Sequence, residues 1–513
     1  MQLNTQPQLI RFLLLSLTVC LLITTINFPV YPNLAVERPP NILFILTDDL
    51  DTASLEYMPQ VKSLLMDGGS SFSNYFVNNS LCCPSRATIL RGQYAHNTGI
   101  LTNNKADGSF VVFHKRNLEE STIATWLKRK GYRTAFIGKY LNLYPYTSKM
   151  NYVPPGWDEW DSPVHGSAYV QYDYTVNENG KLVHYGNQPE DYGTDVYTNK
   201  AKQFLTQAAK SKQPFFLFLS YYAPHQPATP APRHQELFSD AQVPRTQAFN
   251  ETDVSDKPQY LNELPLLDQE QQQKIDYLYQ KRLRSLQAVD EGLVTLYNTL
   301  KATNQLDNTY IFFSSDNGFH LGQHRLPPGK ETAYEEDIHL PLLVRGPHVP
   351  AGKVIESIAG NVDLAPTWAD LAGAPIPDFV DGRSLASLFE LKLNSTSPLN
   401  FYRGKLRSLF PHGWRQVFLV EHWVNPHVTP IIPQYSGLRG SDYTYIEYVN
   451  GEQELYDLRQ DPEQLHNLAQ QTNPKLLAHY AQLLRQLRNC QGKGCRVAES
   501  RKLIDFNSLT GKY

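Results

Sequence analysis

Acidic and amide side chains follow two apolar segments of the sequence. Asp48 and Asp49 end the segment NILFILTDD, and Asp316 and Asn317 follow the apolar part of YIFFSSDNG. Adjacent carboxylates repel each other unless a cation or hydrogen-bond donors neutralise them. Three carboxylates and an amide oxygen form an all-oxygen set that suits Ca²⁺ or Mg²⁺ better than zinc. We therefore predict a divalent-cation site; for the Asp pair alone, the alternative is a solvated turn that caps a helix.

A second motif lies in the segment LCCPSRATILRG, residues 81–92, which contains a Cys-x-Pro-Ser-Arg run. Five further short motifs surround it in a fixed order along the chain. In sequence order the set is Asp48-Asp49, Cys82 to Arg86, Gly138-Lys139, Pro224-His225, Asp316-Asn317-Gly318, and Lys330 within GKETAYEED. Their order and spacing resemble the sulfatase family over almost the whole chain. The segment ELYDLRQDPEQLHNL, 454–468, also resembles the closing motif of that family.

The resemblance implies that residue 82 is chemically modified. In sulfatases the first cysteine of this run is oxidised after synthesis to formylglycine, an aldehyde whose hydrate is the nucleophile. Pro84 and Arg86 fix the register on Cys82, which leaves Cys83 as a bystander. A formylglycine-generating or equivalent maturation enzyme is therefore an implied partner.

The resemblance also implies roles for the charged residues. The metal would be calcium, with Mg²⁺ less favoured, and its ligands would be Asp48, Asp49, Asp316, Asn317 and the formylglycine at position 82. Lys139, His225 and Lys330 would hold the sulfate oxygens or protonate the leaving group, and Arg86 would stabilise the hydrated aldehyde. For Arg86 the alternative is a pairing with a core carboxylate.

The chemistry of sulfate esters agrees with these roles. A sulfate ester is anionic, so cations must surround it, and charge that grows on the bridging oxygen needs a proton or a positive neighbour. One hydroxyl of the hydrated aldehyde would attack sulfur, and the other would expel the covalent sulfate and re-form the aldehyde. A thiol or a serine lacks that second step.

One position departs from the pattern of many arylsulfatases, which have a histidine two residues after the Gly-Lys lysine. Leu141 stands there, and Asn142 is a candidate for the missing donor. The local sequence GKYLN, with CCPSR and YVPPGWDEW, resembles the N-acetylglucosamine-6-sulfatase branch and some microbial and algal arylsulfatases. His320 and His324 are expected to orient their loop by hydrogen bonds.

We therefore predict a sulfuric ester hydrolase that acts on aryl or carbohydrate O-sulfates, with a sulfated small molecule or glycan as substrate. Two alternatives stay open. One is a phosphonate or phosphate monoester hydrolase of the same superfamily, which a second metal with extra ligands would favour. The other is a non-catalytic glycan-binding relative in which Cys82 remains a thiol.

The elements expected to position these residues alternate between strands and helices. Apolar runs at 41–49, 134–140, 215–225, 310–318 and 340–347 have the character of buried parallel strands. Helices are predicted at 121–131, with Ser121 as N-cap, and at 267–301. After residue 375 the pattern predicts a small antiparallel sheet and a terminal helix to about residue 489. The fold class is α/β, and the resemblance implies an alkaline-phosphatase-like mixed central sheet flanked by helices.

The predicted organisation is a signal peptide with a short linker (1–35), a catalytic domain (36–375) and a smaller C-terminal α+β subdomain (376–513). Arg11 precedes the apolar run 12–26, which is typical of a secretory signal, and an uncleaved membrane anchor is the alternative. The protein is thus expected to be secreted or periplasmic. Cys490 and Cys495 are then expected to form a disulfide, with a zinc half-site as the alternative.

The small net charge of −3 favours neither nucleic acid nor a membrane surface as a partner. Apart from the N-terminal segment, no membrane association is expected.

Overall fold

The computed structural model describes residues 38–389, 413–424 and 432–501. The predicted signal segment, 12–26, lies outside these residues. The described residues from Pro39 onward form one unit by their contacts, and the predicted boundary near residue 375 stays a prediction. In this part of the chain, none of the helices combines the length and apolar character that a membrane span needs.

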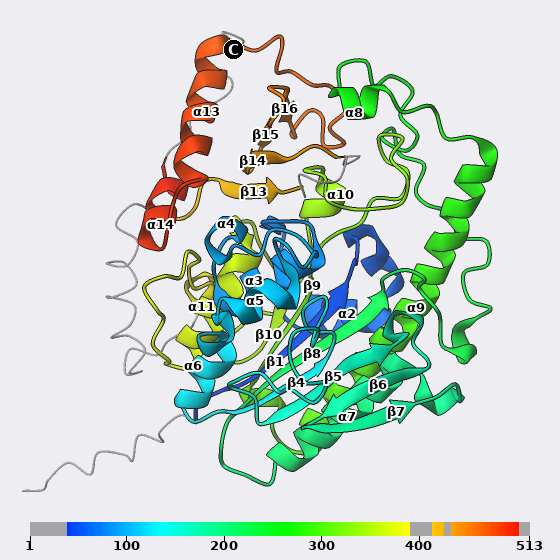
Figure 1. The fold of residues 1–513 in the computed structure, drawn as a ribbon, viewed down its shortest axis with the longest axis vertical. Coiled ribbons are helices and arrows are strands. Elements are labelled where there is room, and N and C mark those ends of the chain that lie inside the picture. Colours follow the sequence, from blue (N-terminus) through cyan, green and yellow to red (C-terminus); the bar gives the residue numbers. More distant parts are fainter. Residues whose placement is uncertain (1–37, 390–412, 425–431, 502–513) are drawn as a thin grey trace, which may run out of the picture. The chain divides into compact units, whose positions relative to one another are not determined.

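A mixed sheet of ten strands forms the centre of the described part (Figure 1). Its strands are β1 (Asn41–Asp48), β2 (Ser70–Phe72), β4 (Arg133–Gly138), β5 (Glu159–Gly166), β6 (Tyr174–Glu178), β7 (Lys181–Tyr185), β8 (Phe215–Pro224), β9 (Thr309–Ser315), β10 (Leu342–Arg345) and β11 (Lys353–Ile355). They lie in the order β11-β2-β10-β9-β1-β8-β4-β5-β6-β7. Neighbours from β9 through β5 pair in parallel, whereas β9–β10, β10–β2, β5–β6 and β6–β7 are antiparallel pairs. The predicted α/β fold with a mixed central sheet is confirmed.

The direction of one strand differs from the prediction. The segment 340–347 was expected to be parallel to its neighbours, but β10 pairs antiparallel with β9. A parallel neighbour requires a crossover that returns the chain to the opposite end of the sheet. The connection from β9 to β10 instead carries Asp316, Asn317, Lys330 and the four-residue helix α10 (Glu335–Ile338), and the chain re-enters the sheet from the end at which β9 stops.

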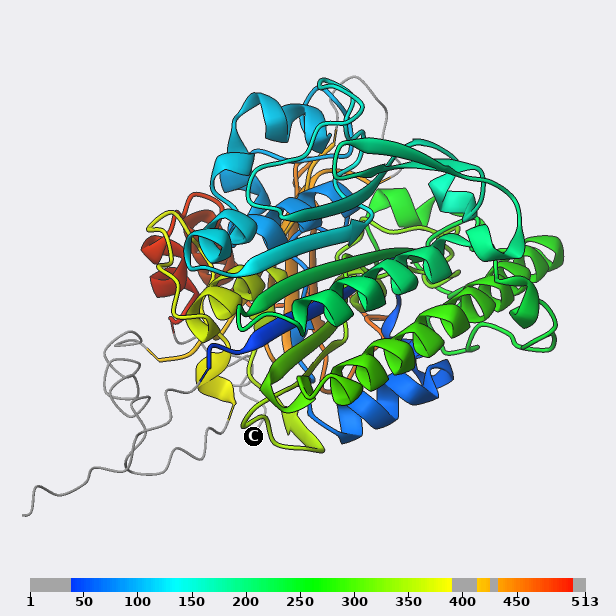
Figure 2. The ribbon, with the colours of Figure 1, turned by 90° about the horizontal axis from the view of Figure 1, so that it is seen from below.

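Helices cover both faces of this sheet, which explains why its strands are apolar at successive positions. The helices of this region are α2 (Pro59–Val61), α3 (Cys82–Arg91), α4 (Ala95–Thr98), α5 (Ser109–Lys115), α6 (Ile123–Arg129), α7 (Gly193–Ala208), α8 (Gln259–Asn262), α9 (Gln269–Ala302) and α11 (Leu364–Leu371). Of these, α8 packs against Tyr334 and Tyr456 instead of the sheet. Phe44 of β1 belongs to the core cluster that includes side chains of α3, α6 and α11. Leu43 and Ile45 belong to the cluster that includes α7 and α9, which lie along the other face (Figure 2).

Two predicted helices can be compared with the structure. The long helix expected at 267–301 is α9, capped by Asp268, whose side chain accepts a hydrogen bond from the Gln271 amide. The helix expected at 121–131 begins one residue later than predicted, because Thr122 rather than Ser121 forms the capping box with Thr125. The Ser121 hydroxyl instead accepts a hydrogen bond from the Trp126 indole.

The C-terminal part contains the predicted antiparallel sheet and helix. The elements are β13 (Phe418–His422), β14 (Tyr435–Arg439), β15 (Tyr443–Tyr448), β16 (Gln453–Asp457), α13 (Pro474–Leu487) and α14 (Lys493–Glu499). The predicted disulfide between Cys490 and Cys495 is confirmed, and it joins the segment after α13 to α14.

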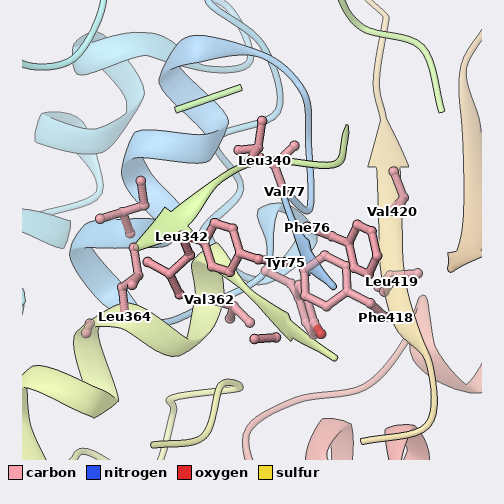
Figure 3. Packing of buried hydrophobic residues seen from close by; sticks show 14 of the residues in the cluster. Tyr75, Phe76, Val77, Leu340, Leu342, Val362, Leu364, Phe418, Leu419 and Val420 are labelled. Atoms are coloured by element: carbon pink, nitrogen blue, oxygen red, sulfur yellow. The ribbon is translucent and has the colours of Figure 1, made fainter. Parts of the chain in front are cut away.

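The small sheet packs against the strand pair formed by β3 (Tyr75–Phe76) and β12 (Ala359–Gly360). Phe418 of β13 lies beside Phe76 in the apolar interior between them (Figure 3). The Asn78 side-chain amide donates a hydrogen bond to the Leu419 carbonyl. Because β3 leads directly into α3, this packing also supports the segment that carries Cys82.

Candidate active site

The candidate site lies where the parallel strands end. Asp48 is the last residue of β1, Lys139 follows β4, His225 follows β8, and Asp316 follows β9. The carboxyl ends of parallel strands meet at one edge of a sheet, so these side chains converge although they are far apart in sequence.

Backbone geometry adapts two of these strand ends to the site. Asp49 has a φ of 67°, in the left-handed region, and this turn lets both Asp48 and Asp49 contribute to one cluster instead of facing opposite sides of the sheet. Gly138 has a φ of 102°, and a Cβ atom there would lie 1.8 Å from the Ser220 carbonyl oxygen. Only glycine fits directly before Lys139, which is the physical basis of the Gly-Lys motif.

Cys82 is the first residue of α3 and is 1% exposed. Its Sγ lies 3.6 Å from Asp48 Oδ1 and 2.9 Å from Lys330 Nζ. Burial raises the pKa of the unmodified thiol to about 11, although Lys139 and Lys330 act in the opposite direction. Position 82 therefore lies at a helix N-terminus, where an anionic group is favoured, between a carboxylate and an ammonium group.

The two carboxylates after β1 are each paired with cationic side chains. Asp48 forms a buried ion pair with Lys139. Asp49 pairs with Lys330, lies 3.6 Å from His225 Nε2, and accepts a hydrogen bond of 2.7 Å from the Asn317 amide. Burial alone would raise the pKa of both carboxyls, but the cations, led by Lys139 for Asp48 and by Lys330 for Asp49, lower it. Both carboxylates are thus ionised.

Arg86 contacts the third carboxylate, that of Asp316, and two further buried oxygen atoms. Its Nε donates to Asp316 Oδ2 at 2.8 Å, and its Nη1 donates to the Lys139 carbonyl and the Ser220 hydroxyl, each at 2.7 Å. Its Nη2 is buried without a hydrogen-bond partner among the described residues and lies 3.9 Å from Asp48. These contacts agree with the alternative interpretation of Arg86, in which it pairs with a core carboxylate. Its role at the hydrated aldehyde stays a prediction.

The carboxylates of Asp48 and Asp49 and the amide oxygen of Asn317 fit a hard divalent cation. Ligand atoms of Asp48, Asp49, Cys82 and His225 lie within 4.8 Å of one another. The Asn317 Oδ1 atom beside them is buried and, among the described residues, has no hydrogen-bond partner. An orphaned amide oxygen next to carboxylates is the arrangement that a calcium or magnesium ion satisfies.

A second group of possible ligands in the described part is His96, Cys490 and Cys495, where the two sulfur atoms are joined in the disulfide.

The structure adds a residue that the sequence did not single out. Tyr169 belongs to the short helix η4 (Ala168–Val170), and its ring centroid lies 4.5 Å from that of His225 and 5.0 Å from Lys139 Nζ. The chain has 31 tyrosines, and this one stands in no motif, so no signal in the sequence distinguishes it. Its ring therefore contacts His225 and Lys139, and it also packs edge-on against the ring of Tyr222.

The two histidines of the loop after β9 contact carboxylates of their own. His320 Nδ1 lies 3.0 Å from Asp337, and His324 Nδ1 lies 2.7 Å from Glu251. These contacts agree with the expected role in orienting the loop that leads to Lys330.

The mixed sheet, with its site at the carboxyl ends of the parallel strands, has the alkaline-phosphatase-like architecture. A family model described as "Sulfatase" matches residues 40–374, and one described as "N-sulphoglucosamine sulphohydrolase, C-terminal" matches residues 322–493. The chain belongs to the sulfatase family.

Several relatives are similar over most of the chain. The human N-acetylglucosamine-6-sulfatase is 34% identical over 485 residues, covering 90% of this chain and 87% of that protein. A putative extracellular sulfatase Sulf-1 homolog of Caenorhabditis elegans is 38% identical over 431 residues, covering 83% of this chain. The chain spans only 57% of the length of that relative.

Among solved structures, BT4656 in complex with its substrate D-glucosamine-2-N,6-O-disulfate has a TM-score of 0.70 and 26% identity. This match covers 90% of this chain and 100% of that one.

Proposed function

We propose that this protein hydrolyses carbohydrate or aryl O-sulfate esters, with formylglycine derived from Cys82 as nucleophile and calcium as metal. The observation that carries the proposal is the convergence of Lys139, His225 and Lys330 with the carboxylates of Asp48 and Asp49 around position 82. A site with this composition can hold a dianionic transition state and a divalent cation at the same time.

The residues divide between two tasks in this proposal. Asp48, Asp49, Asp316 and Asn317 would hold the calcium ion, which supplies positive charge beside the nucleophile when it is bound. Lys139 and Lys330 would bind sulfate oxygens; both ammonium groups are charged, because their aspartate partners raise the pKa more than burial lowers it. His225 is one-quarter exposed. We assign it to the leaving-group oxygen because it is the most exposed of the three side chains.

Sulfated glycans containing glucosamine are the substrate class that the relatives support. The human relative is named for the 6-sulfate of N-acetylglucosamine, and BT4656 holds a disulfated glucosamine. The proposal includes a maturation enzyme that oxidises Cys82, and export by the N-terminal segment, with an uncleaved anchor as the alternative. The extracellular sulfatase homolog supports export.

Two measurements test this proposal. Mass spectrometry of the peptide that spans residue 82 should show the thiol sulfur replaced by oxygen, and a free thiol in active protein would overturn the nucleophile. Initial rates on nitrophenyl sulfate and nitrophenyl phosphate should favour the sulfate. A preference for the phosphate would instead support the monoester-hydrolase alternative.

A further inference from the structure

Two side chains of β14 contact the loop that carries Lys330. The Tyr435 hydroxyl donates a hydrogen bond of 3.1 Å to the carbonyl oxygen of Glu331, the residue that follows Lys330. The Arg439 guanidinium binds the carboxylate of Glu335, at the start of α10, with two hydrogen bonds, from Nε at 2.7 Å and from Nη2 at 2.9 Å. Positions 435 and 439 are four apart on one strand, so both side chains leave the same face of the small sheet. Strand β14 therefore holds this loop at two points.

The contact with Glu331 lies at a strained point of the backbone. Glu331 has a φ of 85°, a conformation that residues with a side chain rarely adopt. Such a conformation persists only when its surroundings hold it. Tyr435 is 1% exposed, and burial raises its pKa well above the usual value, so the phenol stays protonated. The hydroxyl is thus a fixed donor to the backbone directly after Lys330.

The contact with Glu335 is a largely buried ion pair. The Arg439 side chain is 5% exposed and that of Glu335 is 19% exposed. Burial alone would raise the pKa of Glu335, but the cations around it, led by Arg439, lower it, so the carboxylate is ionised. The Arg439 Nη1 atom also donates to the backbone carbonyls of Gly440 and Ser441, which fixes the guanidinium on its own strand end. Because a bidentate pair sets direction as well as distance, Arg439 fixes the orientation of α10.

Helix α10 in turn holds the chain on both sides of Lys330. The Asp337 side chain accepts hydrogen bonds from the amide and the hydroxyl of Thr332, at 2.8 and 2.6 Å, and lies 3.0 Å from His320 Nδ1. Thr332 is two residues after Lys330, and the backbone of His320 pairs with that of Gly329, directly before it. The position of Lys330 therefore depends on how α10 is held.

The guanidinium of Arg439 also contacts the strand that leads into α3. Its Cζ atom lies 4.4 Å from the ring centroid of Phe76, the last residue of β3. The Val77 amide, directly after β3, donates a 2.9 Å hydrogen bond to the Ile338 carbonyl of α10. Arg439 thus contacts both segments that meet at the site, the one before the nucleophile helix and the one that contains α10.

We propose that Tyr435 and Arg439 are positioning residues, through which the C-terminal sheet sets the position of Lys330 relative to residue 82. They act through the backbone after Lys330 and through α10, without contact with the substrate. The inference rests on the proposed sulfatase function, and it assigns the C-terminal sheet a part in catalysis besides its part in folding.

The first test separates this role from a contribution to folding. Tyr435→Phe removes only the hydroxyl and should lower kcat/KM on nitrophenyl sulfate by about fivefold, the effect of one neutral hydrogen bond. In a Lys330→Gln background the same substitution should change kcat/KM by less than about twofold, because it acts through Lys330. Tyr443→Phe alters a buried tyrosine of the same sheet whose hydroxyl has no hydrogen-bond partner among the described residues. This matched control should retain wild-type activity. Equal losses from Tyr435→Phe with and without Lys330 would overturn the inference.

A conservative series tests Arg439. Arg439→Lys keeps the charge but loses the two parallel hydrogen bonds, and should lower kcat/KM on nitrophenyl sulfate by about tenfold. Arg439→Gln, which also loses the charge, should lower it by about a hundredfold. Arg488→Gln removes an ion pair with Glu447 in which the arginine is 37% exposed. This control should change kcat/KM by less than about twofold. Equal values for Arg439→Lys and Arg439→Gln would contradict positioning by this ion pair.

Hydrogen exchange gives a readout that needs no turnover. The backbone amides of residues 329–336 should exchange at least about fivefold faster in Tyr435→Phe than in the wild type, whereas Tyr443→Phe should leave them unchanged. Unchanged exchange in Tyr435→Phe would overturn the inference, even if Lys330→Gln has no measurable turnover or Arg439→Gln fails to fold. Absence of turnover on nitrophenyl sulfate by the mature wild-type enzyme would overturn the proposed function instead. The exchange rates would still decide whether β14 holds the loop.

Discussion

The Nζ atom of Lys330 lies 2.9 Å from the Sγ atom of Cys82, and the same ammonium group pairs with Asp49. One lysine therefore touches both the residue proposed to become the nucleophile and a carboxylate proposed to bind the metal. Lys330 follows Gly329, which exchanges backbone hydrogen bonds with His320. His320 is in turn held by Asp337, so the position of Lys330 depends on the whole loop after β9.

The adjacent cysteines provide a matched pair of variants. Cys82→Ala should reduce turnover by more than about 10³-fold, because loss of a nucleophile removes the covalent route. Cys83→Ala should retain activity, since its side chain belongs to the apolar core, and should lower the free energy of unfolding by about 1 kcal/mol. Steady-state kinetics and denaturant unfolding measure both effects. Substantial activity in Cys82→Ala would contradict the proposed mechanism.

Calcium binding should be visible in stability as well as in activity. A ligand that binds only the folded state at 100 times its Kd stabilises by about 2.7 kcal/mol. Added Ca²⁺ should therefore raise the Tm of the metal-free protein. In Asn317→Ala, which removes the orphaned amide oxygen, a higher Ca²⁺ concentration should be needed for the same shift. Asn304→Ala, remote from the site at the end of α9, is the control and should respond as the wild type does. Identical titrations for Asn317→Ala and wild type would count against this ligand.

Arg86 should be essential to folding as well as to the site. Arg86→Met would leave Asp316 buried without its cationic partner, and breaking a buried pair in this way costs about 3–5 kcal/mol. Lys128→Met breaks an ion pair with Asp158 whose lysine is 44% exposed, and should cost less than about 1 kcal/mol. Denaturant unfolding of the two variants makes the comparison. A similar small loss in both would show that Arg86 is not structurally required.

The sequence predicted those parts of the site that depend on strand ends. Asp48, Lys139, His225 and Asp316 could be placed together because each follows an apolar run, and the runs are parallel neighbours in the sheet. The direction of β10 could not be predicted, since an isolated apolar run has the same composition in either orientation.

Tyr169 could not be predicted for a different reason. It reaches the site through the packing of its ring on His225, and contacts between rings leave no periodicity in the sequence. A cavity beside Lys139 is lined in part by the same segment. Its lining residues can be identified only when β5, η4 and the turn after β4 are positioned in three dimensions.

His96 should make the stability of the protein depend on pH above neutrality. Its side chain is 10% exposed, with Nδ1 at 2.9 Å from Glu421 and Nε2 at 3.0 Å from the Cys490 carbonyl. Burial alone would lower the pKa of His96, but Glu421 and the carbonyl raise it from 6.5 to about 9. Because the folded-state pKa is the higher one, the stabilisation is complete below about pH 6.5 and is lost as the pH rises to about 9. Its size is about 3 kcal/mol. His96→Gln lacks this titration, so the difference in free energy of unfolding between wild type and variant should shrink by that amount from pH 6 to pH 9. A difference that is constant across this range would show that His96 does not carry the charge that its contacts indicate.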